Sequence, residues 1–141
     1  MPKRILLCDD EIHILRAAEF KLKRAGYDVE IASDGQEAWE SIQQRAPDIL
    51  ITDCQMPRLS GFELTQRVRE NPPTRDLPVL MLTAKGFEVS HEEMAEKWNV
   101  IGVIAKPFSP RELLDTVNRI LGAADDALAG AAGAQGRKTG R

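Results

Sequence analysis

The sequence has few of the residues on which several classes of protein depend. Two cysteines and two histidines among 141 residues are too few for a disulfide framework or a zinc site. No apolar run reaches the roughly 18 residues of a membrane span, and the first residues lack the apolar stretch of a signal peptide. We therefore expect a cytoplasmic protein whose Cys8 and Cys54 are reduced thiols.

The chain also lacks an excess of positive charge. Its formal net charge is −3, with 29% charged and 43% hydrophobic residues, which is the balance of an ordinary globular domain. Surfaces that bind nucleic acid or acidic lipid are usually strongly basic. We expect no direct contact with nucleic acid or membrane.

Short apolar runs alternate with amphipathic segments along most of the chain. Strands are predicted at residues 5–8, 27–32, 49–52, 79–82 and 102–105, and helices at 12–25, 34–46, 60–71, 90–98 and 109–121. Ile12, Leu15 and Leu22 recur at helical spacing and are expected to face the core. Five strands alternating with five helices predict an α/β fold with a parallel sheet covered on both faces.

The third apolar run, Ile49 to Thr52, ends in Asp53. Because the carboxyl ends of parallel strands meet at one edge of a sheet, polar residues after neighbouring strands should share one crevice. The residues at these ends are Asp9, Asp10, Asp53, Thr83 and Lys106. The sequence therefore predicts a polar site at this edge.

Three carboxylates in one crevice must either become protonated or hold a cation. Two like charges about 4 Å apart repel by roughly 4 kcal/mol at an effective dielectric constant of 20. Lys106 supplies one positive charge, and an all-oxygen ligand set selects Mg²⁺, with Mn²⁺ as an alternative. Such a metal completes its shell with phosphate oxygens, so Thr83 and Lys106 are expected to contact a phosphoryl group and Asp53 to act as its nucleophile.

These motifs resemble those of the receiver domains of two-component response regulators. The matching residues are Cys8-Asp9-Asp10-Glu11, Asp53-Cys54-Gln55-Met56-Pro57 with Gly61, Thr83-Ala84 and Lys106-Pro107-Phe108. The resemblance implies a (βα)5 flavodoxin-like fold, doubly wound, with strand order 2-1-3-4-5. It also implies that Asp53 accepts a phosphoryl group from a histidine kinase or a histidine phosphotransfer protein.

The resemblance assigns further roles. Asp10, Asp53 and the backbone carbonyl of Gln55 would bind Mg²⁺ directly, Asp9 would act through a water, and Lys106-Pro107 would be a cis peptide. The family often carries an aromatic switch residue where this chain has Val103. We hypothesise that Gln55 and Lys85, each two residues after a site residue, shield the phosphoryl group from hydrolysis.

We expect residues 1–122 to form the receiver domain and the Ala- and Gly-rich residues 123–141 to form a flexible tail. A short continuation of the last helix into this tail is compatible with its composition. Because so short a tail cannot form an output domain, we expect a stand-alone switch that signals to a protein partner through residues 90–121, unless the sequence is a fragment of a longer regulator. Two alternatives stay open. One is a metal-dependent phosphohydrolase that forms an aspartyl phosphate, although Gln55 stands where such an enzyme needs an acid. The other is an unphosphorylated docking module.

Overall fold

The computed structural model describes residues 2–84 and 91–132, with side chains in the second range described from 92 to 122. Its elements, in chain order, are β1 (Arg4–Cys8), α1 (Ile12–Arg24), β2 (Asp28–Ala32), α2 (Gly35–Gln44), β3 (Ile49–Asp53), α3 (Gly61–Glu70), the 3-10 turn η1 (Pro72–Thr74), β4 (Val79–Thr83), α4 (His91–Trp98), β5 (Gly102–Ala105) and α5 (Pro110–Ala132).

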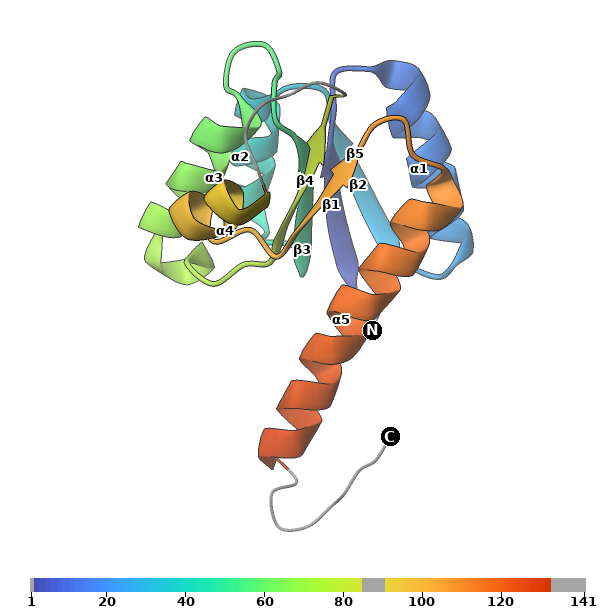
Figure 1. Cartoon of the computed structure of the whole chain (residues 1–141), viewed down its shortest axis with the longest axis vertical. Coiled ribbons are helices and arrows are strands. Elements are labelled where there is room, and N and C mark those ends of the chain that lie inside the picture. Colours follow the sequence, from blue (N-terminus) through green and yellow to red (C-terminus); the bar gives the residue numbers. More distant parts are fainter. Residues whose placement is uncertain (1, 85–90, 133–141) are drawn as a thin grey trace.

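The five strands form one parallel sheet in the order β2-β1-β3-β4-β5. Helices α1 and α5 cover one face, and α2, α3 and α4 cover the other (Figure 1). The predicted fold and strand order are confirmed. β3 lies at the centre of the sheet, so the residue that ends β3 is held by strands on both sides.

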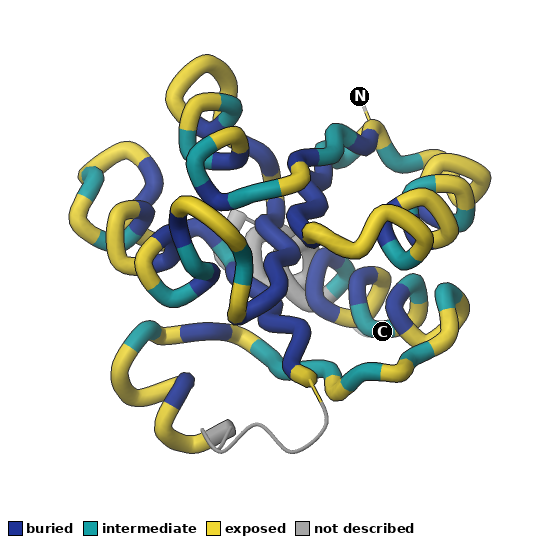
Figure 2. The backbone as a smooth tube through the Cα atoms, turned by 90° about the horizontal axis from the view of Figure 1, so that it is seen from above, coloured by how far each residue is buried: buried dark blue, intermediate teal, exposed yellow. Residues whose placement is uncertain are grey.

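β3 is buried along its whole length. Leu50 packs with Leu64 and Met81 on the side of α2, α3 and α4, whereas Ile49 and Ile51 belong to the cluster under α1 and α5. Strands covered on both faces read as unbroken apolar runs, which is why β3 could be recognised in the sequence. Figure 2 shows the buried strands enclosed by helices whose outer sides are exposed.

Two helices begin with the reciprocal hydrogen bonds of a capping box. The Ser60 hydroxyl accepts from the Glu63 N–H at 3.1 Å while the Glu63 carboxylate accepts from the Ser60 N–H at 2.9 Å. Ser109 and Glu112 make the same pair of bonds at the start of α5. Because a capping box satisfies N–H groups that the helix itself cannot, these sequences fix where α3 and α5 begin beside the sheet edge.

One expectation about a helix start differs from the structure. Ile12 is 48% exposed, because it is the first residue of α1 and burial begins a turn later at Leu15. α5 continues past Gly122 to Ala132, so the last helix extends into the Ala- and Gly-rich segment. Alanine has the highest helix propensity, which explains the continuation. Residues 133–141, Ser90 and Lys85 lie outside the described residues.

None of the helices in residues 2–84 and 91–132 has the length and apolar character needed to cross a bilayer.

Candidate functional site

The carboxylate of Asp53 stands at the end of β3, where the sheet meets the start of α3. Residue 61 is glycine because the backbone approaches so closely here. A Cβ on Gly61 would lie 2.0 Å from the backbone oxygen of Asp53, and the Gly61 N–H donates to the Cys54 carbonyl at 2.9 Å. The N-terminus of α3 is thus fixed directly against the loop that carries Asp53.

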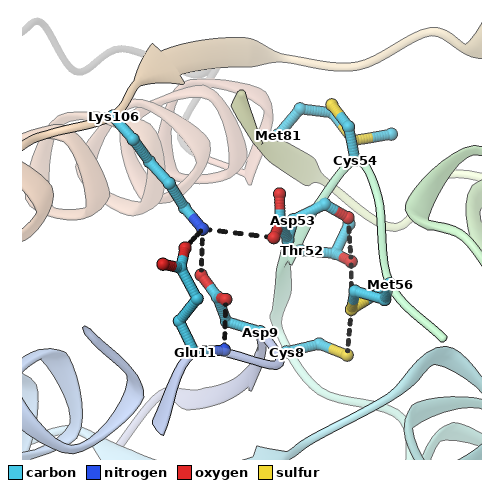
Figure 3. Close-up of polar contacts among 9 residues, drawn as sticks. All are labelled: Cys8, Asp9, Glu11, Thr52, Asp53, Cys54, Met56, Met81 and Lys106. Atoms are coloured by element: carbon cyan, nitrogen blue, oxygen red, sulfur yellow. Dashed lines mark hydrogen bonds and ion pairs between the residues drawn. The ribbon is translucent and has the colours of Figure 1, made fainter. Parts of the chain in front are cut away.

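Lys106 follows β5 and reaches over the sheet edge to the acids (Figure 3). Its Nζ lies 3.1 Å from Asp53 Oδ2 and 2.8 Å from Asp9 Oδ2. Asp9 is fully buried, and its other oxygen accepts from the Glu11 N–H at 2.9 Å. The convergence of Asp9, Asp53 and Lys106 predicted from the strand ends is confirmed.

The charges of the site shift the pKa values of its groups. Burial raises the pKa of Asp53 and the neighbouring Asp9 raises it further, while Lys106 and the N–H of Gln55 partly offset this. Burial alone would lower the pKa of Lys106, but the carboxylates of Asp9, Glu11 and Asp53 outweigh it and raise that pKa. Lys106 therefore stays charged at neutral pH, and the negative charge of Asp53 is costly.

Glu11 contacts Lys106 more closely than either predicted acid, with 2.6 Å between Oε1 and Nζ. Glu11 was predicted only as part of the motif Cys8-Asp9-Asp10-Glu11, with no role of its own. Glu11 is the N-cap residue of α1, but its side chain makes no capping hydrogen bond. Its carboxylate instead binds Lys106, a pairing between residues 95 positions apart that no local sequence pattern indicates.

Asp10 completes a group of three acids suited to a cation. One carboxylate oxygen from each of Asp9, Asp10 and Asp53 lies within 4.8 Å of the others. The buried Asp9 Oδ2 accepts no hydrogen bond among the described residues, although it pairs by charge with Lys106. A buried carboxylate oxygen without a hydrogen bond fits a metal ion or a metal-bound water, so the residues present fit Mg²⁺.

The structure places the other predicted residues around this group. Thr83 is buried at the end of β4, and its carbonyl accepts from the Lys106 N–H at 2.7 Å. Gln55 is exposed in the loop after β3. The Lys106–Pro107 peptide is cis, as the resemblance implied. Val103 is partly buried and packs against the core.

Both thiols lie in the core, on the side of the sheet covered by α2, α3 and α4. Burial raises the pKa of Cys54 to about 12, with a further contribution from Asp53 that Lys106 partly offsets. Burial likewise raises the pKa of Cys8 far above its ordinary value. Buried protonated thiols are unreactive, so they take no part in the chemistry of Asp53.

Comparisons with known proteins agree with this geometry. Residues 5–118 match the model of the response regulator receiver domain. The alkaline phosphatase synthesis transcriptional regulatory protein PhoP of Bacillus subtilis is 38% identical over 86% of this chain and 49% of its own length. The chain belongs to the family of response regulator receiver domains, and the relationship fits a phosphorylation-dependent switch in two-component signalling.

Solved structures show the same relationship. A putative response regulator from Chloroflexus aurantiacus has a TM-score of 0.78 and 38% identity, covering 86% of this chain and 99% of its own. The receiver domain of the sensor histidine kinase PA1611 from Pseudomonas aeruginosa, which holds a magnesium ion in its active site cleft, has a TM-score of 0.76 and 29% identity over 86% of this chain and 99% of its own. The chain spans about half the length of the curated relatives it matches.

Proposed function

We propose that Asp53 accepts a phosphoryl group from a histidine kinase or a histidine phosphotransfer protein, and that the modified domain signals through contacts with another protein. The contact between the buried Asp53 carboxylate and Lys106 carries this proposal. In this contact a carboxylate oxygen and a cation lie side by side at the edge of the sheet. Carboxylates act as nucleophiles in aspartyl-phosphate chemistry.

The transfer can be written from the residues at the site. An oxygen of Asp53 attacks the phosphorus of a phosphohistidine. The new O–P bond forms as the P–N bond breaks, and the imidazole leaves with the electron pair of that bond and takes up a proton. Lys106 and the Thr83 hydroxyl would neutralise and orient the phosphoryl oxygens, which is the main requirement of phosphoryl transfer.

Asp9, Asp10, Asp53 and the backbone carbonyl of Gln55 would hold Mg²⁺ at this edge. When bound, Mg²⁺ would neutralise charge on the phosphoryl oxygens and help to align them with Asp53. The protein contributes the oxygen ligands, and the three acids are already gathered within reach of one ion.

Mg²⁺ is expected to stabilise the fold. At about 100 times its dissociation constant, a ligand of the native state adds about 2.7 kcal/mol, which corresponds to a rise in Tm of roughly 8 °C. Asp10→Asn should lose most of this rise without unfolding, because Asp10 is exposed. Thermal melts with and without MgCl₂ measure the effect.

Asp115→Asn is the matched control, because Asp115 is also exposed but lies on α5 and pairs with Arg111. Asp115→Asn should show the same rise in Tm with Mg²⁺ as the wild type. An equal rise in Tm for Asp10→Asn and the wild type would argue against a metal site at these acids.

One experiment separates a receiver from a phosphohydrolase. Acetyl phosphate and Mg²⁺ should label the protein to at most one phosphoryl group per chain, whereas a phosphate ester such as p-nitrophenyl phosphate should not be turned over. Repeated turnover that depends on Asp53 would favour the hydrolase. Gln55 at the position where a hydrolase needs an acid supports the receiver.

Gln55 is proposed to slow the hydrolysis of the aspartyl phosphate. Its side chain is exposed in the loop beside Asp53, where it can limit the approach of water. Gln55→Ala should shorten the lifetime of the phosphorylated protein about fivefold, which corresponds to about 1 kcal/mol in the barrier. Decay of label after removal of the donor measures this, with Gln66→Ala on α3 as the control; equal lifetimes would refute the role. Lys85 lies outside the described residues.

We propose that α4, β5 and α5, within residues 90–121, carry the output contact. Ile101, beside β5, is 51% exposed and offers an apolar side chain at this face. Val103 offers no aromatic ring to swing at this face, so the signal would pass through shifts of the elements themselves. A cytoplasmic location is part of the same proposal.

A further inference from the structure

Glu11 holds a contact that the proposed phosphotransfer does not use. Its side chain is 58% exposed, yet its Oε1 accepts a hydrogen bond from Lys106 Nζ at 2.6 Å. The two residues are 95 positions apart in the sequence. Among the three carboxylates around this ammonium, Glu11 is the nearest and Asp53, at 3.1 Å, is the farthest.

The arrangement draws the lysine toward β1. Asp9 and Glu11, which both follow β1, lie on one side of the ammonium, and Asp53 lies on the other (Figure 3). An ammonium that is to pair with a phosphoryl group on Asp53 must loosen its contacts on the β1 side. Asp9 is fully buried and fixed by a backbone N–H, whereas Glu11 faces solvent. Glu11 is therefore the partner that can be released at least cost.

Glu11 also adds to the negative charge that faces the donor. Asp9, Asp10, Glu11 and Asp53 contribute four negative charges and Lys106 one positive, which gives −3 without a metal. Phosphoryl donors are anions and are repelled by such a cluster at short range. As long as Glu11 holds Lys106, the one cation among these five side chains is partly neutralised.

We propose that Glu11 is a positioning residue that holds Lys106 in the unphosphorylated protein and gives it up to a phosphoryl oxygen when Asp53 is modified. The contact slows acceptance of the phosphoryl group, and this regulation rests on the proposed role of Asp53. Glu11 acts through Lys106 and touches no reacting atom.

The test is the rate at which acetyl phosphate labels Glu11→Gln. The variant keeps the backbone N–H that supports Asp9 and loses only the charge on the side chain. We expect labelling about tenfold faster than in the wild type. Glu70→Gln is the matched control, because Glu70 is exposed at the far end of α3 and accepts from Gln66; its rate should equal that of the wild type.

A double-mutant cycle shows whether Glu11 acts through Lys106. In a Lys106→Met background, Glu11→Gln should no longer increase the labelling rate, because the effects of contacting residues are coupled. Beryllofluoride affinity, measured by titration of the backbone amide resonances of the same four proteins, should show the same coupling even where labelling is slow. The same gain in both backgrounds would overturn the proposal, and so would a Glu11→Gln rate equal to or below that of the wild type.

Labelling of the wild type distinguishes a failure of the proposed function of Asp53 from a failure of the proposed role of Glu11. If the wild type is not labelled on Asp53, the proposed function fails. If the wild type is labelled on Asp53 but Glu11→Gln is no faster, only the role of Glu11 fails.

Discussion

Asp53→Asn is expected to lose phosphoryl labelling by a factor on the order of 10³ or more, as for removal of a nucleophile. The amide has nearly the shape of the carboxylate and can still accept from Lys106, but it is a far poorer nucleophile. The loss should therefore occur without loss of structure. Labelling by acetyl phosphate in the presence of Mg²⁺, quantified by intact mass, measures it.

Asp76→Asn is the control for this variant, because Asp76 is exposed before β4, at the opposite edge of the sheet. It should be labelled at the wild-type rate. Comparable labelling of Asp53→Asn and the wild type would show that another residue is the acceptor.

Asp53→Asn should also raise thermal stability slightly in Mg²⁺-free buffer. The pKa of Asp53 is raised by burial and by Asp9. For a carboxyl group with a raised pKa in the folded state, the stability gained by protonation is fully present below the unfolded pKa and is lost as pH rises through the folded value. At pH 7 it is lost, so removing the charge should raise the Tm.

Gly61→Ala is expected to destabilise the domain and to slow labelling at the same time. The new Cβ would lie 2.0 Å from a backbone oxygen of Asp53, so α3 or the Asp53 loop must move. Overpacking of this kind costs about 3 kcal/mol, or roughly 10 °C in Tm. Thermal melts and labelling rates test both effects in one protein.

Gly122→Ala provides the matched control. A Cβ at Gly122, inside α5, meets nothing within 4 Å, and alanine is favoured over glycine in a helix by about 1 kcal/mol. This variant should be as stable as the wild type or slightly more so. A Gly61→Ala protein with the wild-type Tm and labelling rate would contradict the close approach of α3 to Asp53.

Much of the fold could be predicted because burial leaves a direct trace in the sequence. Ile49, Leu50 and Ile51 are unbroken apolar residues because helices cover both faces of β3. Ser60 and Ser109, each with a glutamate three residues later, marked the starts of α3 and α5. The convergence at the site followed from topology alone, because parallel strands end at one edge.

The remaining features depend on distances that a sequence does not contain. Glu11 looks like an ordinary capping acid, and only the path of Lys106 across the sheet brings the two together. Asp9 and Asp10 are adjacent in the sequence, yet one is fully buried and the other exposed. The end of α5 at Ala132 could not be fixed from the sequence, because an Ala- and Gly-rich composition suits both a helix and a flexible chain.

Acetyl phosphate tests whether Asp53 is the phosphoryl acceptor without requiring the cognate kinase. The labelled protein is reduced with borohydride, which converts an aspartyl phosphate to homoserine, and its peptides are sequenced by mass spectrometry. We predict homoserine at position 53 in the wild type treated with donor and Mg²⁺. Homoserine at another position, or none at all, would show that Asp53 is not the acceptor.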